Sequence, residues 1–216
     1  MKRNRLFFAI IILLGFAGSL YAVGSFSDAP AYSRDSTKQF KPADTYEQVM
    51  QIWKTPEDIN GWIAANFSYD MARAVQLSET QRERNAQLSI YQPSEFFTRK
   101  TGVCVDLSRF AVETLRRIDP RTEPKYLMIE FDPIQISGNT LRLHWLVSFK
   151  RNGRYFYFAD SKRPGYIAGP FNDTQEFING YAKYRNKKIV SFRELESYQK
   201  TRRSKKQKHQ ASPKNP

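Results

Sequence analysis

The chain has 216 residues, of which 40% are hydrophobic and 14% are aromatic. This composition is typical of a packed globular domain and excludes a chain that is disordered throughout. The formal net charge is +14, but no nucleic-acid-binding motif accompanies it, so specific recognition of nucleic acid is not predicted. A single cysteine excludes an internal disulfide.

The first 24 residues have the pattern of an export signal. Lysine and arginine in residues 1–5 precede an apolar run over residues 6–17, which matches the charged and apolar regions of a signal peptide. The run can be extended to Val23, which is long enough for a tight membrane anchor. We therefore expect an exported protein of the periplasm or cell envelope. The pattern leaves open whether residues 1–24 are removed as a signal peptide or retained as an inner-membrane anchor.

Residues 25–44 are predicted to be a tether in which little is buried, and residues 45–198 to form one domain. The first clear helix begins at Thr55, because a hydroxyl N-cap, a proline at the first helical position and acids in the first turn all favour a helix start. Its apolar face consists of Ile59, Trp62, Ile63 and Phe67.

A short helix is predicted from Gln92, and it stops at Gly102, which we expect to allow a tight turn of the backbone. The polar stretch 77–87 before it is compatible with a loop or an exposed helix. A longer amphipathic helix follows and places Cys104 in its first turn. Its apolar positions recur at steps of three and four residues: Val103, Leu107, Phe110, Ala111, Thr114 and Leu115.

The position of Cys104 has two interpretations. A thiol at a helix N-terminus lies near unpaired backbone N–H groups and the positive end of the helix dipole, which favour the thiolate and raise its nucleophilicity. Alternatively, Cys104 is a buried structural residue that packs as a small hydrophobe.

After Asp119-Pro120 the pattern changes to that of strands, predicted at residues 126–131, 141–149 and 155–160. Asn152-Gly153 predicts a hairpin turn between the second and third strands, which makes them antiparallel. A short edge strand at 166–168, a helix capped by Asp173-Thr174 and a last strand at 188–192 complete the domain. Helices followed by an antiparallel sheet indicate an α+β fold.

His144 and Asp160 lie on the two strands of this hairpin. His209 lies in the basic C-terminal stretch, so His144 is the only histidine that the domain can supply. If the hairpin contains one bulge, the numbers of residues that separate His144 and Asp160 from the turn have the same parity. Both side chains can then reach one face of the sheet. With Cys104 they would supply a nucleophile, a general base and an orienting acid. The backbone N–H of Cys104 would donate to the developing oxyanion.

These residues resemble the transglutaminase-like superfamily, of the bacterial cysteine peptidase type. The resemblance rests on Asn66-Phe-Ser-Tyr69-Asp70, on Thr101-Gly-Val-Cys104-Val-Asp106, and on His144 and Asp160. It implies a papain-like core in which a Cys-bearing helix packs on an antiparallel sheet. It also implies that Cys104 is the nucleophile, His144 the base and Asp160 the orienting acid, with Tyr69 as a candidate oxyanion donor.

The resemblance implies acyl transfer through a thioester. We expect hydrolysis of peptide or protein amide bonds, and the alternatives are a protein cross-linking transglutaminase and a non-catalytic binding module of the cell envelope. No cofactor is predicted, and no metal site, because the sequence has no cluster of histidines and cysteines or calcium-loop spacing. Residues 199–216 form a basic tail, predicted to be disordered, which is either solvated or binds an anionic envelope surface.

Overall fold

The computed structural model describes residues 28–30, 39–84, 88–136 and 138–199. The predicted leader, residues 1–24, and the basic tail beyond Gln199 lie outside the described residues. Within the described part of the chain, no helix combines the length and the apolar character that crossing a bilayer requires.

Helices precede the sheet in the chain, as the sequence predicts. They are α2 (Tyr46–Ile52), α3 (Pro56–Asn66), α4 (Met71–Gln76), α5 (Glu79–Arg84), α6 (Pro93–Arg99), α7 (Cys104–Ile118) and the 3-10 turn η1 (Pro120–Thr122), and α8 (Thr174–Arg185) comes later. The helix start at Thr55 is confirmed: the Thr55 hydroxyl accepts from the Asp58 N–H, and the Asp58 carboxylate accepts from the Thr55 N–H in return.

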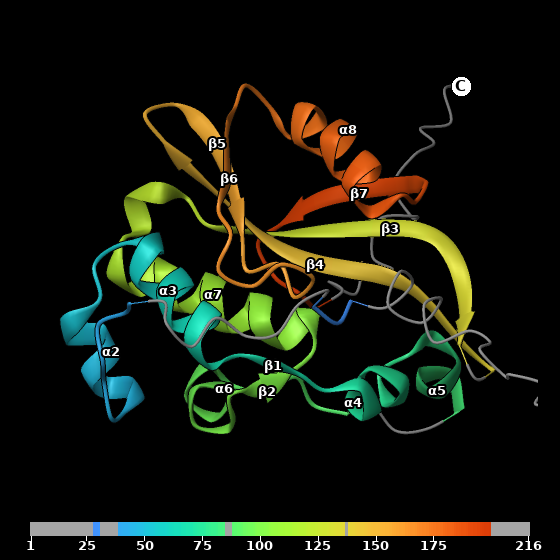
Figure 1. Ribbon diagram of the computed structural model, residues 1–216, viewed down its shortest axis with the longest axis horizontal. Helices are drawn as coiled ribbons and strands as arrows, with labels where there is room; N and C mark the ends of the chain where they lie inside the picture. The colour runs from blue at the N-terminus through green and yellow to red at the C-terminus, as the bar shows by residue number, and fades with distance from the viewer. Residues whose placement is uncertain (1–27, 31–38, 85–87, 137, 200–216) are drawn as a thin grey trace, which may run out of the picture.

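Five antiparallel strands form one sheet in the order β6-β5-β4-β3-β7 (Figure 1). They are β3 (Lys125–Ile136), β4 (Asn139–Arg151), β5 (Arg154–Phe158), β6 (Ala168–Phe171) and β7 (Ile189–Leu195). The hairpin turn at Asn152-Gly153 is confirmed by the pairing of Arg151 with Arg154. The α+β prediction is therefore confirmed.

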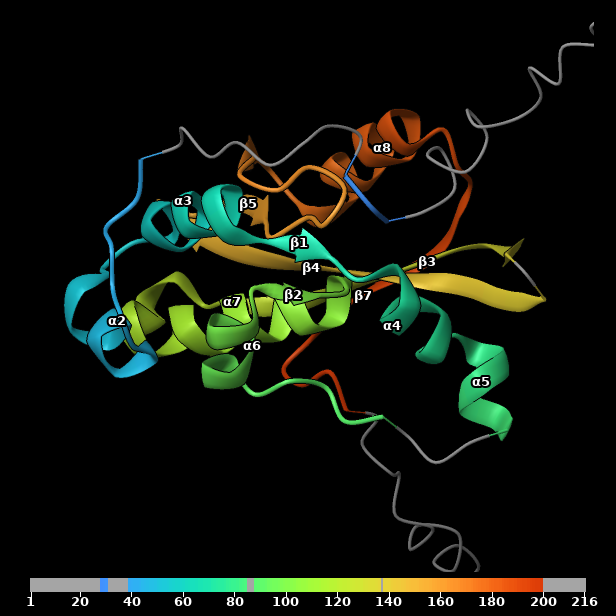
Figure 2. The same ribbon diagram turned by 60° about the horizontal axis from the view of Figure 1, so that its bottom comes forward.

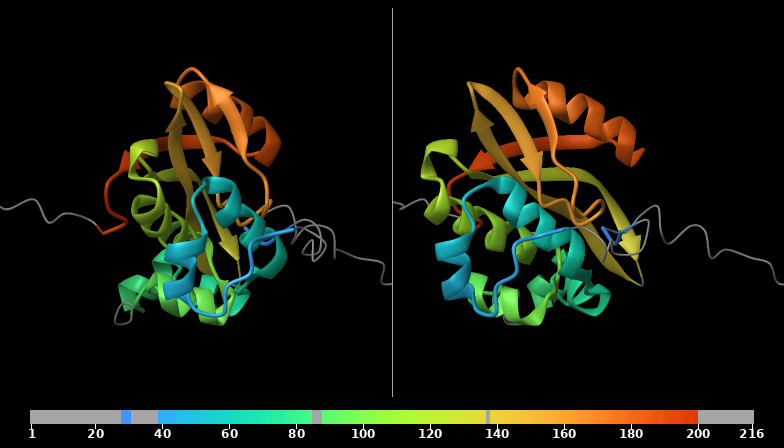
Figure 3. Two further views of the ribbon diagram at one scale, coloured as in Figure 1. Left: turned by 90° about the vertical axis from the view of Figure 1, so that its left-hand side faces the viewer. Right: turned by 60° about the vertical axis from the view of Figure 1, so that its left-hand side comes forward.

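Helices cover both faces of the sheet. Helix α8 lies on one face, and α2, α3, α6 and α7 lie on the other (Figures 2 and 3). Alternating residues of β4 supply the two cores: Trp145 and Val147 face the α7 side, whereas Leu146 faces the α8 side. The α7 core is rich in aromatic rings, including the stacked pair Trp62 and Phe97, whose centroids are 5.1 Å apart.

The predicted tether contacts the domain at several points. Phe40 and Ala43 pack against the α7 core, and the Trp53 indole N–H donates to the Lys41 carbonyl at 2.9 Å. Asp28 also reaches the domain interior, with 17% of its side chain exposed. The described residues of 25–44 are partly buried or exposed, so the tether remains a prediction, but it makes specific contacts with the domain through apolar and charged groups.

Candidate active site

Cys104 is the first residue of α7, as predicted, and a small parallel ladder sets its position. Strand β1 (Ser68–Tyr69) pairs with β2 (Thr101–Gly102), with Tyr69 opposite Gly102. The chain therefore enters α7 two residues after a fixed backbone pairing. The Cys104 side chain is 7% exposed and belongs to the α7 core.

Asp106 anchors the start of α7. Its fully buried carboxylate accepts from the N-cap N–H of Val103 at 3.0 Å and from the Tyr91 N–H at 3.0 Å. It also accepts two hydrogen bonds from the Arg73 guanidinium, at 2.7 and 2.8 Å. A bidentate pair of this kind fixes both partners in orientation, so Asp106 holds the helix end that carries Cys104.

Gly102 is required here for a reason other than the predicted tight turn. A Cβ atom at this position would lie 2.9 Å from the Phe96 ring and 3.1 Å from the Asp106 side chain. Only a residue without a side chain allows α6 and the start of α7 to approach this closely.

His144 lies on β4 opposite Ile129, and its side chain is fully buried. Its Nε2 atom is 3.1 Å from Asp160 Oδ1. In the β4–β5 ladder Val147 pairs with Phe158, so the residue opposite His144 would be 161 rather than 160. The chain leaves β5 at Phe158, and Ala159 adopts a left-handed conformation with φ 58°. The left-handed residue Ala159, rather than the predicted bulge, turns Asp160 toward the imidazole.

Asp160 has several further donors. Its carboxylate accepts from the Lys162 N–H at 2.9 Å, from Arg163 Nε at 3.2 Å and from the Tyr181 hydroxyl at 3.0 Å. Burial raises the pKa of Asp160, but the hydrogen bond and charge of His144, with Arg185 and Arg163, outweigh it and leave the pKa below its usual value. Asp160 is therefore a carboxylate held in one orientation against Nε2.

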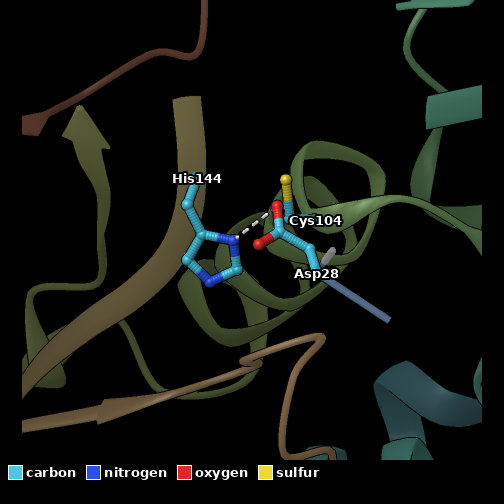
Figure 4. Close-up of side chains that lie close together, drawn as sticks. All are labelled: Asp28, Cys104 and His144. Atoms are coloured by element: carbon cyan, nitrogen blue, oxygen red, sulfur yellow. Dashed lines mark ion pairs between the residues drawn. The ribbon is translucent and has the colours of Figure 1, made fainter. Parts of the chain in front are cut away.

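Sequence reasoning missed Asp28, which approaches the other ring nitrogen. Asp28 Oδ2 lies 3.0 Å from His144 Nδ1, and Figure 4 shows this carboxylate between the imidazole and Cys104. Its Oδ1 atom accepts from Arg185 Nη2 at 2.6 Å. No local pattern around Asp28 signals this contact. Arg185 and Tyr181, both on α8, were also missed, although their spacing of one helical turn is visible in the sequence.

Cys104 shares this side of the imidazole with Asp28. One ligand atom each from Asp28, Cys104 and His144 lies within 4.8 Å of the others. Nδ1 thus faces the thiol and the Asp28 carboxylate, whereas Nε2 faces Asp160 and lies 3.0 Å from the Tyr181 hydroxyl. The structure therefore brings together Cys104, His144 and Asp160 in the order that the predicted roles need.

The protonation of this cluster differs from the expectation of a thiolate. Burial raises the pKa of Cys104, and the Asp28 charge adds to the increase, which outweighs the hydrogen bonds from His144 and the Trp145 backbone. Burial lowers the pKa of His144, but the Asp28 charge and the hydrogen bonds with Asp160 and Asp28 leave it well above 6.5. At neutral pH the imidazole is therefore protonated between two carboxylates while Cys104 remains a thiol.

Tyr69 lies beside this cluster. Its side chain lines the pocket that Asp28 also lines, and burial, with the charges of Asp28 and Cys104, raises its pKa well above 10. The phenol is therefore protonated at neutral pH and able to donate a hydrogen bond, as an oxyanion donor must. Its role remains a prediction.

Asp28, Cys104 and His144 are also the side chains among the described residues that could together hold a metal ion, since carboxylate, thiolate and imidazole are zinc ligands. The sequence analysis did not predict this grouping, because Asp28 is far from the other two in the chain. Arg185, 2.6 Å from the Asp28 carboxylate, places a fixed positive charge at the same point. Coulomb repulsion from that guanidinium opposes a bound cation.

A known protein family matches most of the chain. Residues 37–193 match the model of a family described as a transglutaminase-like domain. The match covers most of the chain and includes Cys104, His144, Asp160 and Tyr69, whereas Asp28 lies before it. No curated protein matches the chain.

Proposed function

The chain belongs to the transglutaminase-like domain family, and from this membership we propose that it is a thiol-dependent acyl-transfer enzyme that hydrolyses peptide or protein amide bonds. The observation that carries the proposal is the use of both imidazole nitrogens of His144. Nε2 lies 3.1 Å from the Asp160 carboxylate, and Nδ1, which contacts Asp28, is on the side of the ring toward Cys104 (Figure 4). This is the arrangement of an orienting acid, a base and a nucleophile.

In the proposed reaction, the Cys104 thiol first loses its proton to solvent, and the thiolate beside the His144 imidazolium attacks the carbonyl carbon of the substrate to form a C–S bond. The Cys104 N–H, with Tyr69 as a candidate second donor, stabilises the oxyanion. The C–N bond then breaks, and the leaving amine takes a proton from the His144 imidazolium. A water molecule, deprotonated by His144, attacks the thioester, and cleavage of the C–S bond releases the acid and restores Cys104. Asp160 keeps the imidazole oriented throughout.

A first experiment tests whether Cys104 forms the acyl-enzyme. The full chain is incubated with a protein substrate such as casein, quenched in acid and examined by intact mass, beside Cys104→Ser and His144→Gln. We expect an acyl adduct and new substrate amino termini with the wild type alone. Incorporation of a fluorescent primary amine into casein glutamines, without new amino termini, would identify a cross-linking transferase instead. An unmodified Cys104 with the alkylation profile of an ordinary thiol, in the wild type and also in Asp28→Ala, would favour the non-catalytic binding module.

We further propose that this chemistry takes place in the cell envelope. The support is the charged and apolar pattern of residues 1–24. A basic C-terminal stretch suited to anionic envelope surfaces adds to it. Fractionation of cells that express the full chain tests the location, and recovery of the protein with cytosolic markers would contradict it.

A further inference from the structure

The Asp28 carboxylate is bound in the candidate active site like a ligand. It contacts two cationic groups that are distant from it in the chain, Arg185 Nη2 at 2.6 Å and His144 Nδ1 at 3.0 Å. The Arg185 side chain is 1% exposed, and its Nη1 atom donates to the Tyr181 hydroxyl at 3.0 Å. Arg185 is therefore fixed in place, as a built anion site requires.

The charge around this point favours an anion. Besides Arg185 and the protonated His144, Lys162 and Lys187 lie close enough for their charges to affect Asp28 and Arg185. Burial and the Arg185 charge lower the pKa of Lys187 to about 8, although the Asp28 charge opposes this. Buried cations are costly unless an anion accompanies them. The Asp28 carboxylate is the anion beside Nδ1 of the imidazole, and the Asp160 carboxylate is the anion beside Nε2.

Asp28 also competes with a Cys104 thiolate as the anion beside His144. The Nδ1 atom is buried 3.0 Å from the Asp28 carboxylate, whose charge and hydrogen bond raise the pKa of His144. In an active thiol–imidazole pair, the thiolate is the anion next to this nitrogen. With Asp28 present the cluster already has its anion, and a second negative charge on Cys104 is disfavoured.

Asp28 lines a small pocket that is partly open to solvent. Asp28, Tyr69, Phe131, Leu143 and Lys187 are among its lining residues, and its volume is about 40 Å³. Asp28 lies both on the lining of this pocket and within 4.8 Å of Cys104 and His144, so a substrate that reaches Cys104 from the pocket competes with the Asp28 carboxylate.

We propose that Arg185 and His144 form a carboxylate-binding subsite at Cys104, and that Asp28 occupies it as a self-inhibiting ligand. When Asp28 is displaced, the same subsite binds a carboxylate of the substrate, either an acidic side chain or a peptide C-terminus. The substrate part rests on the proposed hydrolytic function, whereas the subsite and its occupation by Asp28 do not.

The test compares two alkylating reagents on Cys104 in the full chain. Iodoacetate carries a carboxylate, and iodoacetamide is its neutral analogue of nearly the same size. The variants are Asp28→Ala, Asp28→Ala with Arg185→Gln, and two controls that remove exposed charges, Asp44→Ala and Lys183→Gln. Labelling is followed by intact mass at pH 7, and circular dichroism verifies the fold of each variant.

We expect Asp28→Ala to raise labelling by both reagents about tenfold or more, and to favour iodoacetate over iodoacetamide. Adding Arg185→Gln should reduce the iodoacetate preference by about ten- to a hundredfold, the range expected for loss of a hydrogen bond to a charged group. Arg185→Lys, which keeps the charge, should retain part of the preference if Arg185→Gln does not fold. Both control variants should label like the parent protein.

Competitors identify the source of the carboxylate. In Asp28→Ala, the α-amide of N-acetylaspartate offers a side-chain carboxylate only, and N-acetylglycine offers a terminal one only. Protection of Cys104 by either supports the substrate part of the proposal. Protection by neither overturns that part.

If Cys104 in Asp28→Ala is alkylated at the wild-type rate, or if the preference for iodoacetate does not depend on Arg185, the proposed carboxylate subsite is wrong. These outcomes are separate from the acyl-enzyme experiment, because alkylation needs no substrate and its dependence on His144 is measured independently.

Discussion

Tyr181 and Asp160 lie 3.0 Å apart, with the Tyr181 hydroxyl donating to Asp160 Oδ2. The same hydroxyl is 3.0 Å from His144 Nε2, and the two rings are stacked with an interplanar angle of 16°. Tyr181 is fully buried on α8, on the face of the sheet opposite α7. The helix that follows the sheet therefore helps to orient the imidazole and the carboxylate that the sheet supplies.

Tyr181→Phe tests this positioning role. The ring stays and the hydroxyl is lost, so Asp160 loses one donor and Arg185 one acceptor. We expect a loss of about 1 kcal/mol of folding stability and an upward shift in the pH at which Cys104 is half alkylated, because His144 is held less firmly. Tyr184→Phe on the exposed side of α8 is the control. A destabilised variant with an unchanged alkylation profile would show that Tyr181 is only structural.

Asp160→Asn tests the acid beside Nε2. Asp160 contributes to the raised pKa of His144, so the neutral amide should lower that pKa and weaken the imidazolium that accompanies a Cys104 thiolate. The alkylation profile should then shift to higher pH, and acyl-enzyme formation should fall by at least ~100-fold. Asp173→Asn is the matched control, since either residue serves as the N-cap of α8. Equal profiles for the two variants would exclude Asp160 from the triad.

Asp106→Asn should strongly destabilise the protein. The substitution removes the charge that pairs with Arg73, a pair with side chains 7% and 0% exposed. Breaking such a pair costs about 3–5 kcal/mol, because a buried charge is left without its partner. Glu95→Gln is the comparison: it breaks the exposed Glu95–Arg99 pair, which should cost less than about 1 kcal/mol. Urea unfolding at pH 7 measures both, and similar midpoints would contradict the anchoring role of Asp106.

Gly102→Ala and Gly180→Ala should have opposite effects. At Gly102 the new Cβ would contact Phe96 and Asp106 too closely, which should cost about 1–3 kcal/mol and displace the start of α7. At Gly180, inside α8, no atom lies within 4 Å of the new Cβ, so alanine should stabilise the helix by about 1 kcal/mol. Thermal unfolding compares the two. A Gly102→Ala protein as stable as the wild type would show that the neighbouring side chains yield without cost.

The sequence predicted the elements that carry local signals. The helix from Thr55, the helix that begins at Cys104 and the hairpin at Asn152-Gly153 each have a cap, an apolar period or a turn dipeptide, and all three are present. Helix α2 was missed, although Thr45 and Gln48 form a cap signal at its start. Its two buried residues, Tyr46 and Val49, are too few to form an apolar pattern typical of a helix.

The candidate site was predictable only in part. Cys104 and His144 could be chosen because the chain has one cysteine and two histidines, and Asp160 because the Asn152-Gly153 hairpin brings it near His144. The left-handed Ala159 that aims Asp160 has no sequence signature, since alanine seldom adopts this conformation. Asp28 was not predictable either, because its binding depends on Arg185, 157 residues away. Contacts of this range are set by tertiary packing rather than by local pattern.

The contribution of Asp28 to stability should depend on pH. Burial raises the pKa of Asp28, but the charges and hydrogen bonds of His144 and Arg185 outweigh this and leave it well below 3.8. A group whose pKa is depressed on folding stabilises the native state above its unfolded pKa, about 3.9, and this stabilisation is lost as the pH falls through the folded value. Asp28→Asn should therefore cost about 3 kcal/mol at pH 7, and this cost should decrease as the pH falls from about 4 to 2. Urea unfolding of both proteins across this range measures the difference, with the exposed Asp44→Asn as control. A cost for Asp28→Asn that equals that of Asp44→Asn at pH 7 would mean that the carboxylate is not bound to Arg185 and His144 in solution.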